Sequence, residues 1–112
     1  MIAITAKRWL NRARVLAAEL DKILSEGPGP DRGAARAEAE NKVIEWALVK
    51  TEIVNAACKL SDRRERVVLI QYFCNRLTVR EIAADLELTI EQTFRIKRAA
   101  IKHLGEVLGL GL

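Results

Sequence analysis

The segment that decides the fold is residues 78–104, TVREIAADLELTIEQTFRIKRAAIKHL. It contains two capping boxes, in which a Thr side chain and the side chain three residues later each satisfy a free backbone N–H at a helix start. Thr78 and Glu81 form the first box, and Thr89 and Gln92 form the second. This spacing predicts a short helix, a tight turn and a longer helix, which is the outline of a helix-turn-helix motif.

The apolar residues of this segment predict how its two helices pack. Ile82, Ala83 and Leu86 share one side of the first helix, and the small Ala83 allows the second helix to cross closely. Leu88, in the turn, is expected to point back to the core. On the second helix, the expected inner residues are Ile96, Ala99 or Ala100, and Leu104.

The opposite side of the second helix carries residue types that bind DNA. Arginine and glutamine can bond bidentately to guanine and adenine edges, glutamate can accept from cytosine, and lysine neutralises phosphate. That side carries Glu91, Gln92, Arg95, Arg98 and Lys102. Positive charge is concentrated in residues 89–104, where Arg95, Lys97, Arg98 and Lys102 stand against Glu91 alone. We therefore expect this helix to lie in a DNA major groove.

A further helix is predicted ahead of this segment. Ser61 precedes a polar first turn, residues 62–65, whose acidic side chains suit the positive end of a helix dipole. The helix then runs through apolar residues, which are Val67, Leu69, Ile70, Tyr72, Phe73 and Cys74.

Residues 60–104 resemble the C-terminal, promoter-binding domain of bacterial sigma factors. The resemblance rests on the runs LSDRRERVVL at residues 60–69 and TVREIAADLELT at residues 78–89, and it continues through Leu104. It implies a four-helix domain whose last helix reads a promoter element in the major groove. The resemblance also implies that Arg80 contacts phosphate, and that the base-contacting positions are Glu91, Gln92, Arg95 and Arg98.

Two positions depart from the family pattern. Glu87 stands in the turn where the family has Gly, and a left-handed, non-glycine residue costs about 1–2 kcal/mol. Phe94 stands where the family often has a basic residue, and it is expected to contact either a thymine methyl group or a protein interface. The complete set of predicted DNA-binding residues is Arg80, Glu91, Gln92, Phe94, Arg95, Arg98 and Lys102.

The first half of the chain predicts a helical hairpin. Residues 27–33 hold two Pro and three Gly, which cannot continue a helix, and the second helix is expected over about Ala34 to Lys59. Apolar stripes recur at steps of three and four on both sides of the break. They comprise Trp9, Ala13, Leu16, Leu20 and Ile23 before it, and Ala39, Val43, Trp46, Lys50, Ile53, Ala57 and Leu60 after it.

Two roles are open for this hairpin, because two helices alone bury little surface. Its apolar residues either contribute to the core of the chain or contact another molecule, which is a second copy in a homodimer or RNA polymerase. The candidate interface residues are Trp9, Leu16, Leu20, Val43, Trp46 and Ile53. The predicted division is a helical arm over residues 1–59, with a linker at 27–33, and a DNA-binding domain over residues 60–112.

Composition and charge exclude several other classes. The 112 residues carry a net charge of +4, and no alternating strand pattern is present, so an all-α fold with about five helices is expected. The sequence lacks an apolar stretch of membrane-spanning length and a signal-peptide layout, which predicts a cytoplasmic protein. His103 is expected to face solvent or phosphate, and Cys58 and Cys74 predict neither a zinc site nor a disulfide. We therefore expect no enzyme activity, metal or cofactor.

These features together predict a sequence-specific, DNA-binding transcriptional regulator. The layout of a helical arm followed by a sigma-like module is similar to phage transcriptional regulators of the RinA/ArpU type, which implies a phage or prophage origin. Two alternatives stay open. One is a DNA-packaging protein resembling a small terminase subunit, and the other is a sigma-like decoy that binds RNA polymerase or a regulator without DNA.

Overall fold

The computed structural model describes residues 4–25 and 32–110 of the chain. These residues form five α-helices and one π-helical turn, and no strand occurs among them. The elements are α1 (Ala6–Ser25), α2 (Arg32–Ala57), α3 (Arg63–Leu69), the π-turn η1 (Ile70–Cys74), α4 (Val79–Leu86) and α5 (Ile90–Leu108). The predicted all-α fold with about five helices is confirmed. None of the described helices is long and apolar enough to cross a membrane.

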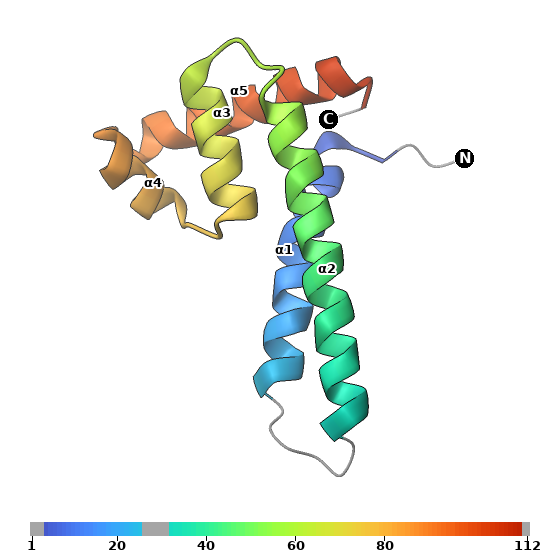
Figure 1. Cartoon of the computed structure of the whole chain (residues 1–112). Helices are drawn as coiled ribbons and strands as arrows, with labels where there is room; N and C mark the ends of the chain where they lie inside the picture. The colour runs from blue at the N-terminus through green and yellow to red at the C-terminus, as the bar shows by residue number, and fades with distance from the viewer. Residues whose placement is uncertain (1–3, 26–31, 111–112) are drawn as a thin grey trace.

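Helices α1 and α2 lie side by side as an antiparallel hairpin, which we call the arm (Figure 1). The side of α1 that faces α2 is apolar, and its buried residues are Ala6, Leu10, Ala13, Leu16, Ala17 and Leu20. Two ion pairs also join the helices, Arg12 with Glu52 and Lys42 with Glu19, each with an N···O distance of 2.8 Å. Apolar packing and cross-helix charge pairs therefore both hold the arm together.

The bounds of α2 differ from the sequence prediction. Arg32 and Gly33 are helical, although the predicted break extended through Gly33, and residues 27–31 of that break lie outside the described residues. At the other end, α2 stops at Ala57 rather than Lys59. The N–H of Leu60 donates to the carbonyl of Ala57 at 3.0 Å, so the chain leaves the helix through a tighter turn.

The remaining elements, α3, η1, α4 and α5, gather at one end of the arm, and we call them the head (Figure 1). Asp62, rather than Ser61, caps α3, because its carboxylate accepts from the N–H groups of Arg64 and Glu65 at 2.8 and 3.3 Å. Helix α3 then widens into η1, whose last two residues, Phe73 and Cys74, are buried.

One hydrophobic core joins the arm and the head. Leu10 of α1, Ile53 of α2 and Leu104 of α5 are completely buried in it, and Phe73 of η1 is 1% exposed. The predicted division near residue 60 therefore runs through a shared core, and the two parts pack as one unit. The far half of the arm extends beyond the head (Figure 1).

Candidate nucleic-acid interface

Both predicted capping boxes are present at the starts of α4 and α5. The hydroxyl of Thr78 accepts from the N–H of Glu81, and the carboxylate of Glu81 accepts from the N–H of Thr78, both at 3.1 Å. The hydrogen bond from the Thr78 backbone N–H, with a smaller contribution from the Thr78 side chain, lowers the pKa of the Glu81 carboxyl. Thr89 and Gln92 repeat the exchange at 3.0 and 2.9 Å. The boxes therefore determine where each helix of the motif begins.

The turn between α4 and α5 depends on Glu87, which is left-handed with φ 56° and ψ 41°. The N–H of Glu87 donates to Ala84, and the N–H of Leu88 donates to Ala83, at 3.3 and 2.9 Å. This is the Schellman arrangement that commonly ends a helix. Gly109 ends α5 with the same handedness, at φ 69°. Glu87 therefore adopts, at a cost of about 1–2 kcal/mol, a conformation that glycine adopts freely.

The inner sides of α4 and α5 largely follow the prediction. Ile82, Ala83, Ala100 and Leu104 are buried, and Leu86, Leu88, Ile96 and Ala99 are half-buried. Sequence reasoning missed Thr93, which is fully buried and whose hydroxyl donates to the carbonyl of Thr89 at 3.0 Å. The signal for it was its position, since Thr93 lies seven residues before Ala100 and therefore on the same side of the helix.

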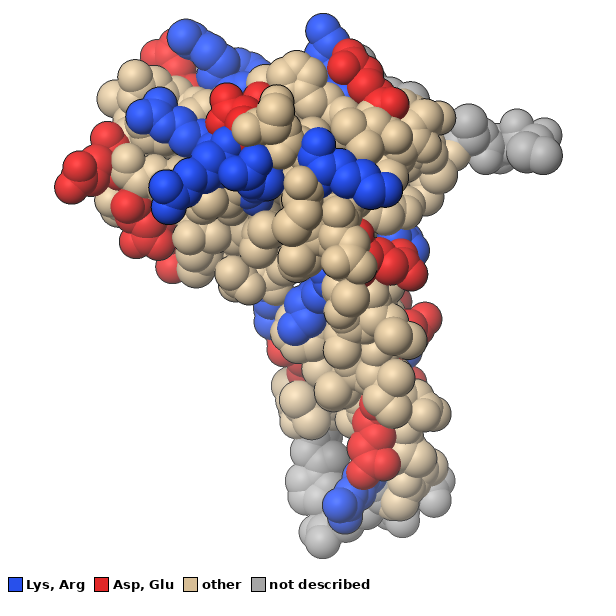
Figure 2. Space-filling model, turned by 45° about the horizontal axis from the view of Figure 1, so that its top comes forward, with Lys and Arg blue, Asp and Glu red and all other residues tan. Residues whose placement is uncertain are grey.

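The outer face of α5 consists of Glu91, Arg95, Arg98 and Lys102, all of which are exposed. Since an α-helix has about 3.6 residues per turn, these positions fall in one narrow sector. Arg95 lies 3.5 Å from Glu91, and both side chains are at least 71% exposed, so this ion pair is weak. The exposed Arg95, Arg98 and Lys102 side chains of this face can therefore offer cationic donors to an anionic partner. Figure 2 shows Lys and Arg side chains gathered on one side of the head as a whole.

Gln92, which the sequence places beside this face, already uses its side-chain oxygen in a hydrogen bond within the protein. Its side-chain oxygen accepts from the N–H of Thr89 in the second capping box. The predicted bidentate bond to adenine would need the same oxygen as acceptor. Gln92 is exposed, so its side-chain N–H₂ group remains a donor. Its first role in this structure is therefore to cap α5.

Lys97, which the sequence includes in the positive segment but not in the outer face of α5, contacts an aromatic ring. Its ammonium nitrogen lies 3.8 Å from the centre of the Tyr72 ring, and the Arg14 guanidinium lies 4.2 Å from the same centre. Arg14 also donates to the carbonyl of Tyr72 at 3.0 Å. These cation–π contacts join α5, η1 and α1 around one aromatic ring.

His103 is exposed to solvent as expected, with 47% of its side chain accessible, and it also contacts a carboxylate of the chain that was not predicted. Its Nδ1 lies 2.6 Å from Oε1 of Glu65, which is 7% exposed at the start of α3. The hydrogen bond to Glu65 raises the pKa of His103. Sequence reasoning missed this contact because the two residues are far apart in the chain and no local pattern links them.

Arg80 and Phe94 complete the predicted DNA-binding set. Arg80 is exposed in the first turn of α4, on a different helix from the other members. Phe94 is 44% exposed and lies three residues after Glu91 and four before Arg98. Since residues three and four apart are neighbours on a helix surface, Phe94 borders the outer face of α5.

The candidate interface residues of the arm divide by burial. Leu16, Leu20 and Ile53 are at most 8% exposed, so the chain itself covers them. Their predicted interface role is therefore corrected, and they belong to the interior of the chain. Trp9 is half-buried beside the core, and Val43 is 46% exposed. Val43 is thus the one of these residues that lies at the surface.

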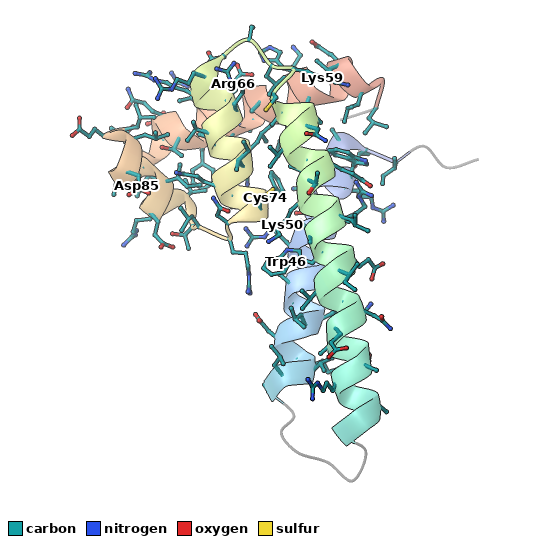
Figure 3. The ribbon with its side chains drawn as sticks, in the orientation of Figure 1. Trp46, Lys50, Lys59, Arg66, Cys74 and Asp85 are labelled. Atoms are coloured by element: carbon teal, nitrogen blue, oxygen red, sulfur yellow. The ribbon has the colours of Figure 1, made fainter. Side chains whose placement is uncertain are left out.

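Trp46, the last candidate interface residue, lies half-buried beside the core at the junction of arm and head. Figure 3 shows Trp46, Lys50 and Cys74 along this junction. The Lys50 ammonium lies 3.6 Å from the centre of the Trp46 ring, and Trp46 Nε1 is buried without a hydrogen-bond partner among the described residues. Burial raises the pKa of the Cys74 thiol, and both Cys74 and Cys58 are free.

The surface around Val43 is an apolar groove of about 690 Å³ in the far half of the arm. Its lining comprises Leu20, Ile23, Leu24, Arg36, Ala39, Glu40, Val43 and Ile44. Leu24 is 67% exposed, Ile44 is 60% exposed, and Leu48, one turn further along α2, is 61% exposed. Sequence reasoning missed Ile44 and Leu48 because they fall outside the apolar stripe predicted to face α1.

The head thus holds α5 on two flanks, at Tyr72 through Lys97 and at Glu65 through His103, while the outer face of α5 remains exposed. No protein-family model matches this chain, no curated protein is similar to it, and no solved structure matches its fold. The candidate interface is therefore defined by the geometry and charge of its own residues.

Proposed function

We propose that this protein binds double-stranded DNA through α5 and thereby regulates transcription. The observation that carries the proposal is the outer face of α5, where Arg95, Arg98 and Lys102 are exposed on the second helix of a capped helix-turn-helix. An α-helix fits the major groove, arginine can bond guanine bidentately, and lysine and arginine neutralise phosphate. This combination of shape and charge suits duplex DNA.

The contacts that hold α5 support the same function. Lys97 and His103 use their charged or polar groups in contacts with other elements of the chain, on opposite flanks of the helix. They orient α5 without occupying its outer face. A recognition surface on a helix that is fixed from two sides can reach the groove with little loss of conformational entropy.

Replacement of Arg95 and Arg98 by alanine tests the proposal. Since removal of one arginine–base contact costs about 1–3 kcal/mol, the double variant should lose about tenfold or more in affinity for duplex DNA. Both side chains are exposed, so the helical fold and the thermal unfolding should change little. Lys7→Ala with Lys22→Ala is the matched control, because it removes two exposed charges from α1. Equal losses in the two double variants would contradict a specific role for α5.

The salt dependence of DNA binding gives a second test of the outer face of α5. Counterion release makes the logarithm of affinity fall linearly with the logarithm of salt concentration. Each arginine that contacts phosphate contributes a slope of about one, so the Arg95 and Arg98 variant should show a shallower slope than the parent. A parent whose affinity is independent of salt would contradict DNA binding through this face.

We further infer that the arm joins two copies of the chain. Exposed apolar patches mark contact surfaces, and the groove exposes Leu24, Val43 and Ile44. The charges in its lining are Arg36 and Glu40, which pair at 3.1 Å, so the groove carries no net charge. A two-fold axis can therefore bring two such grooves together with Arg36 of one copy opposite Glu40 of the other.

Measurement of molar mass in solution tests this inference. We expect twice the 12.5 kDa of one chain for the parent, and a shift toward the single-chain mass when Val43 and Ile44, which both line the groove, are changed to glutamate. Val15→Glu is the control, because Val15 is 53% exposed on α1, outside the groove. A parent that stays monomeric would contradict self-association and leave the groove to another protein, of which RNA polymerase is the candidate.

A further inference from the structure

Helix α5 exposes two large apolar side chains in its first two turns. Ile90 is 42% exposed and Phe94 is 44% exposed, and their spacing of four residues makes them neighbours on the helix surface. The other phenylalanine of the chain, Phe73, is 1% exposed in the core. The exposed aromatic side chain at the start of this helix is therefore a candidate for contact with an apolar group of a binding partner.

The polar side chains around this apolar pair are already partly engaged. The side-chain oxygen of Gln92 accepts from Thr89 in the capping box, and Arg95 lies 3.5 Å from Glu91. Ile90 and Phe94 therefore add an apolar patch to the start of α5, beside the exposed side chains of Glu91 and Arg95. A base-reading surface at this point would combine apolar contacts with hydrogen-bonding groups.

The edges of unmodified base pairs offer one apolar group in the major groove, which is the C5-methyl group of thymine. Phenylalanine and other apolar side chains contact this methyl group. Phe94 borders both Glu91 and Arg98, so it lies at the edge of the face that we assign to the groove.

We propose that Ile90 and Phe94 read thymine methyl groups, so that A·T pairs lie opposite the first two turns of α5. This inference rests on the proposed DNA binding and adds the kind of base that is read. Arg98 follows one turn after Phe94 and is exposed, which leaves it for a guanine edge or a phosphate beside those A·T pairs.

Deoxyuridine substitution tests the proposal, because it removes the methyl group and preserves base pairing. The preferred duplex is first selected from random DNA with the parent protein, and each thymine is then replaced in turn. Burial of one methyl-sized group contributes about 0.8 kcal/mol, so each contacted thymine should cost about fourfold in affinity when replaced. Phe94→Ala should lose the preference for thymine over deoxyuridine at the position that Phe94 contacts.

The control variant is Val107→Ala, which changes an apolar residue of similar exposure, 44%, near the other end of α5. It should keep the parent's preference for thymine. Since Phe94 and Val107 are both more than 40% exposed, both variants should stay folded, and thermal unfolding checks this.

Each other outcome overturns the inference in a recognisable way. A parent that binds duplex DNA but tolerates deoxyuridine at every position overturns the thymine contact alone. A parent that binds no duplex at low salt overturns the proposed function and this inference with it. If Phe94→Ala lowers the molar mass and keeps the thymine preference, the apolar pair belongs to a protein interface and the inference is wrong.

Discussion

The head and the arm differ in what holds their helices in place. In the head, side-chain caps at Asp62, Thr78 and Thr89 begin α3, α4 and α5. In the arm, α1 and α2 are joined by buried residues such as Leu10 and Ile53, and by ion pairs between the helices. Local hydrogen bonds define the ends of the head helices, whereas packing between distant residues holds the arm together.

The exposed surfaces of the two regions differ in the same way. The head exposes Arg95 and Arg98 on one helix face, and the far half of the arm exposes Leu24, Val43 and Ile44. Charged donors suit phosphate and base edges, and an apolar surface suits another protein. The comparison teaches that one small chain can present two kinds of surface, a charged one on the head and an apolar one on the arm.

The largest expected effect tests the packing of the arm. Ile53 is completely buried in the shared core, so Ile53→Ala should lower the free energy of unfolding by about 2–5 kcal/mol. Ile44→Ala, with the same change in size at a position 60% exposed, should cost no more than about 0.5 kcal/mol at low protein concentration. Urea unfolding measures both variants. Separate transitions for arm and head would contradict the shared core.

A smaller effect tests the local signals of the head. Thr89→Ala removes the cap of α5 and should cost about 1 kcal/mol in unfolding free energy. Thr51→Ala makes the same change in the middle of α2, where the hydroxyl donates to the carbonyl of Ala47, and should be nearly neutral because alanine favours helix. Equal losses of stability for Thr89→Ala and Thr51→Ala in urea would contradict this account. They would show that the cap of α5 contributes no more than a surface threonine in the middle of a helix.

A substitution in the turn between α4 and α5 should change the free energy of unfolding by a similar amount, but toward higher stability. Glu87→Gly relieves a left-handed residue in the turn before α5, so it should raise the free energy of unfolding by about 1 kcal/mol. Gly109→Ala places a side chain in the same conformation at the end of α5, where an added Cβ would meet no atom within 4 Å. It should therefore lose stability through backbone strain alone. A Glu87→Gly variant less stable than the parent would contradict this account of the turn.

The smallest effect concerns pH and the contact between α3 and α5. Glu65 raises the pKa of His103 in the folded protein above its ordinary value of 6.5. The resulting stabilisation is fully present below the unfolded pKa and is lost as pH rises through the raised folded pKa. The urea midpoint should therefore be higher at about pH 6 than at about pH 8.

His103→Gln supplies the control for this pH dependence. His103 is the sole histidine of the chain, so the variant should remove most of the difference between the two urea midpoints. A parent that becomes more stable as the pH rises from about 6 to about 8 would have the opposite sign and would contradict the role of the Glu65 contact.

Much of the head could be predicted from local sequence, because its signals lie within a few residues of one another. Thr78 with Glu81, and Thr89 with Gln92, identified the helix starts that the structure contains. The partners of Lys97 and His103 could not be predicted, since Tyr72 and Glu65 lie on other elements of the fold. Only part of the positive charge in residues 89–104 therefore lies on the outer face of α5.

The arm was harder to predict because α2 carries apolar residues on more than one side. Steps of three and four selected Val43, which is 46% exposed, and omitted Val49, which is 7% exposed. Periodicity alone cannot choose between two apolar stripes on one helix. The choice depends on where α1 and η1 lie against α2, which is a tertiary property.

The sequence by itself determined that the chain is helical, where α4 and α5 begin, and which side of α5 carries Arg95 and Arg98. Capping and helical periodicity are local, so a short stretch of chain contains all the information they need. Only the tertiary structure decided that Lys97 contacts Tyr72 and His103 contacts Glu65, that Ile53 is core, and that Ile44 is exposed. Those outcomes depend on which distant surfaces meet, and burial is a property of the packed chain rather than of any one segment.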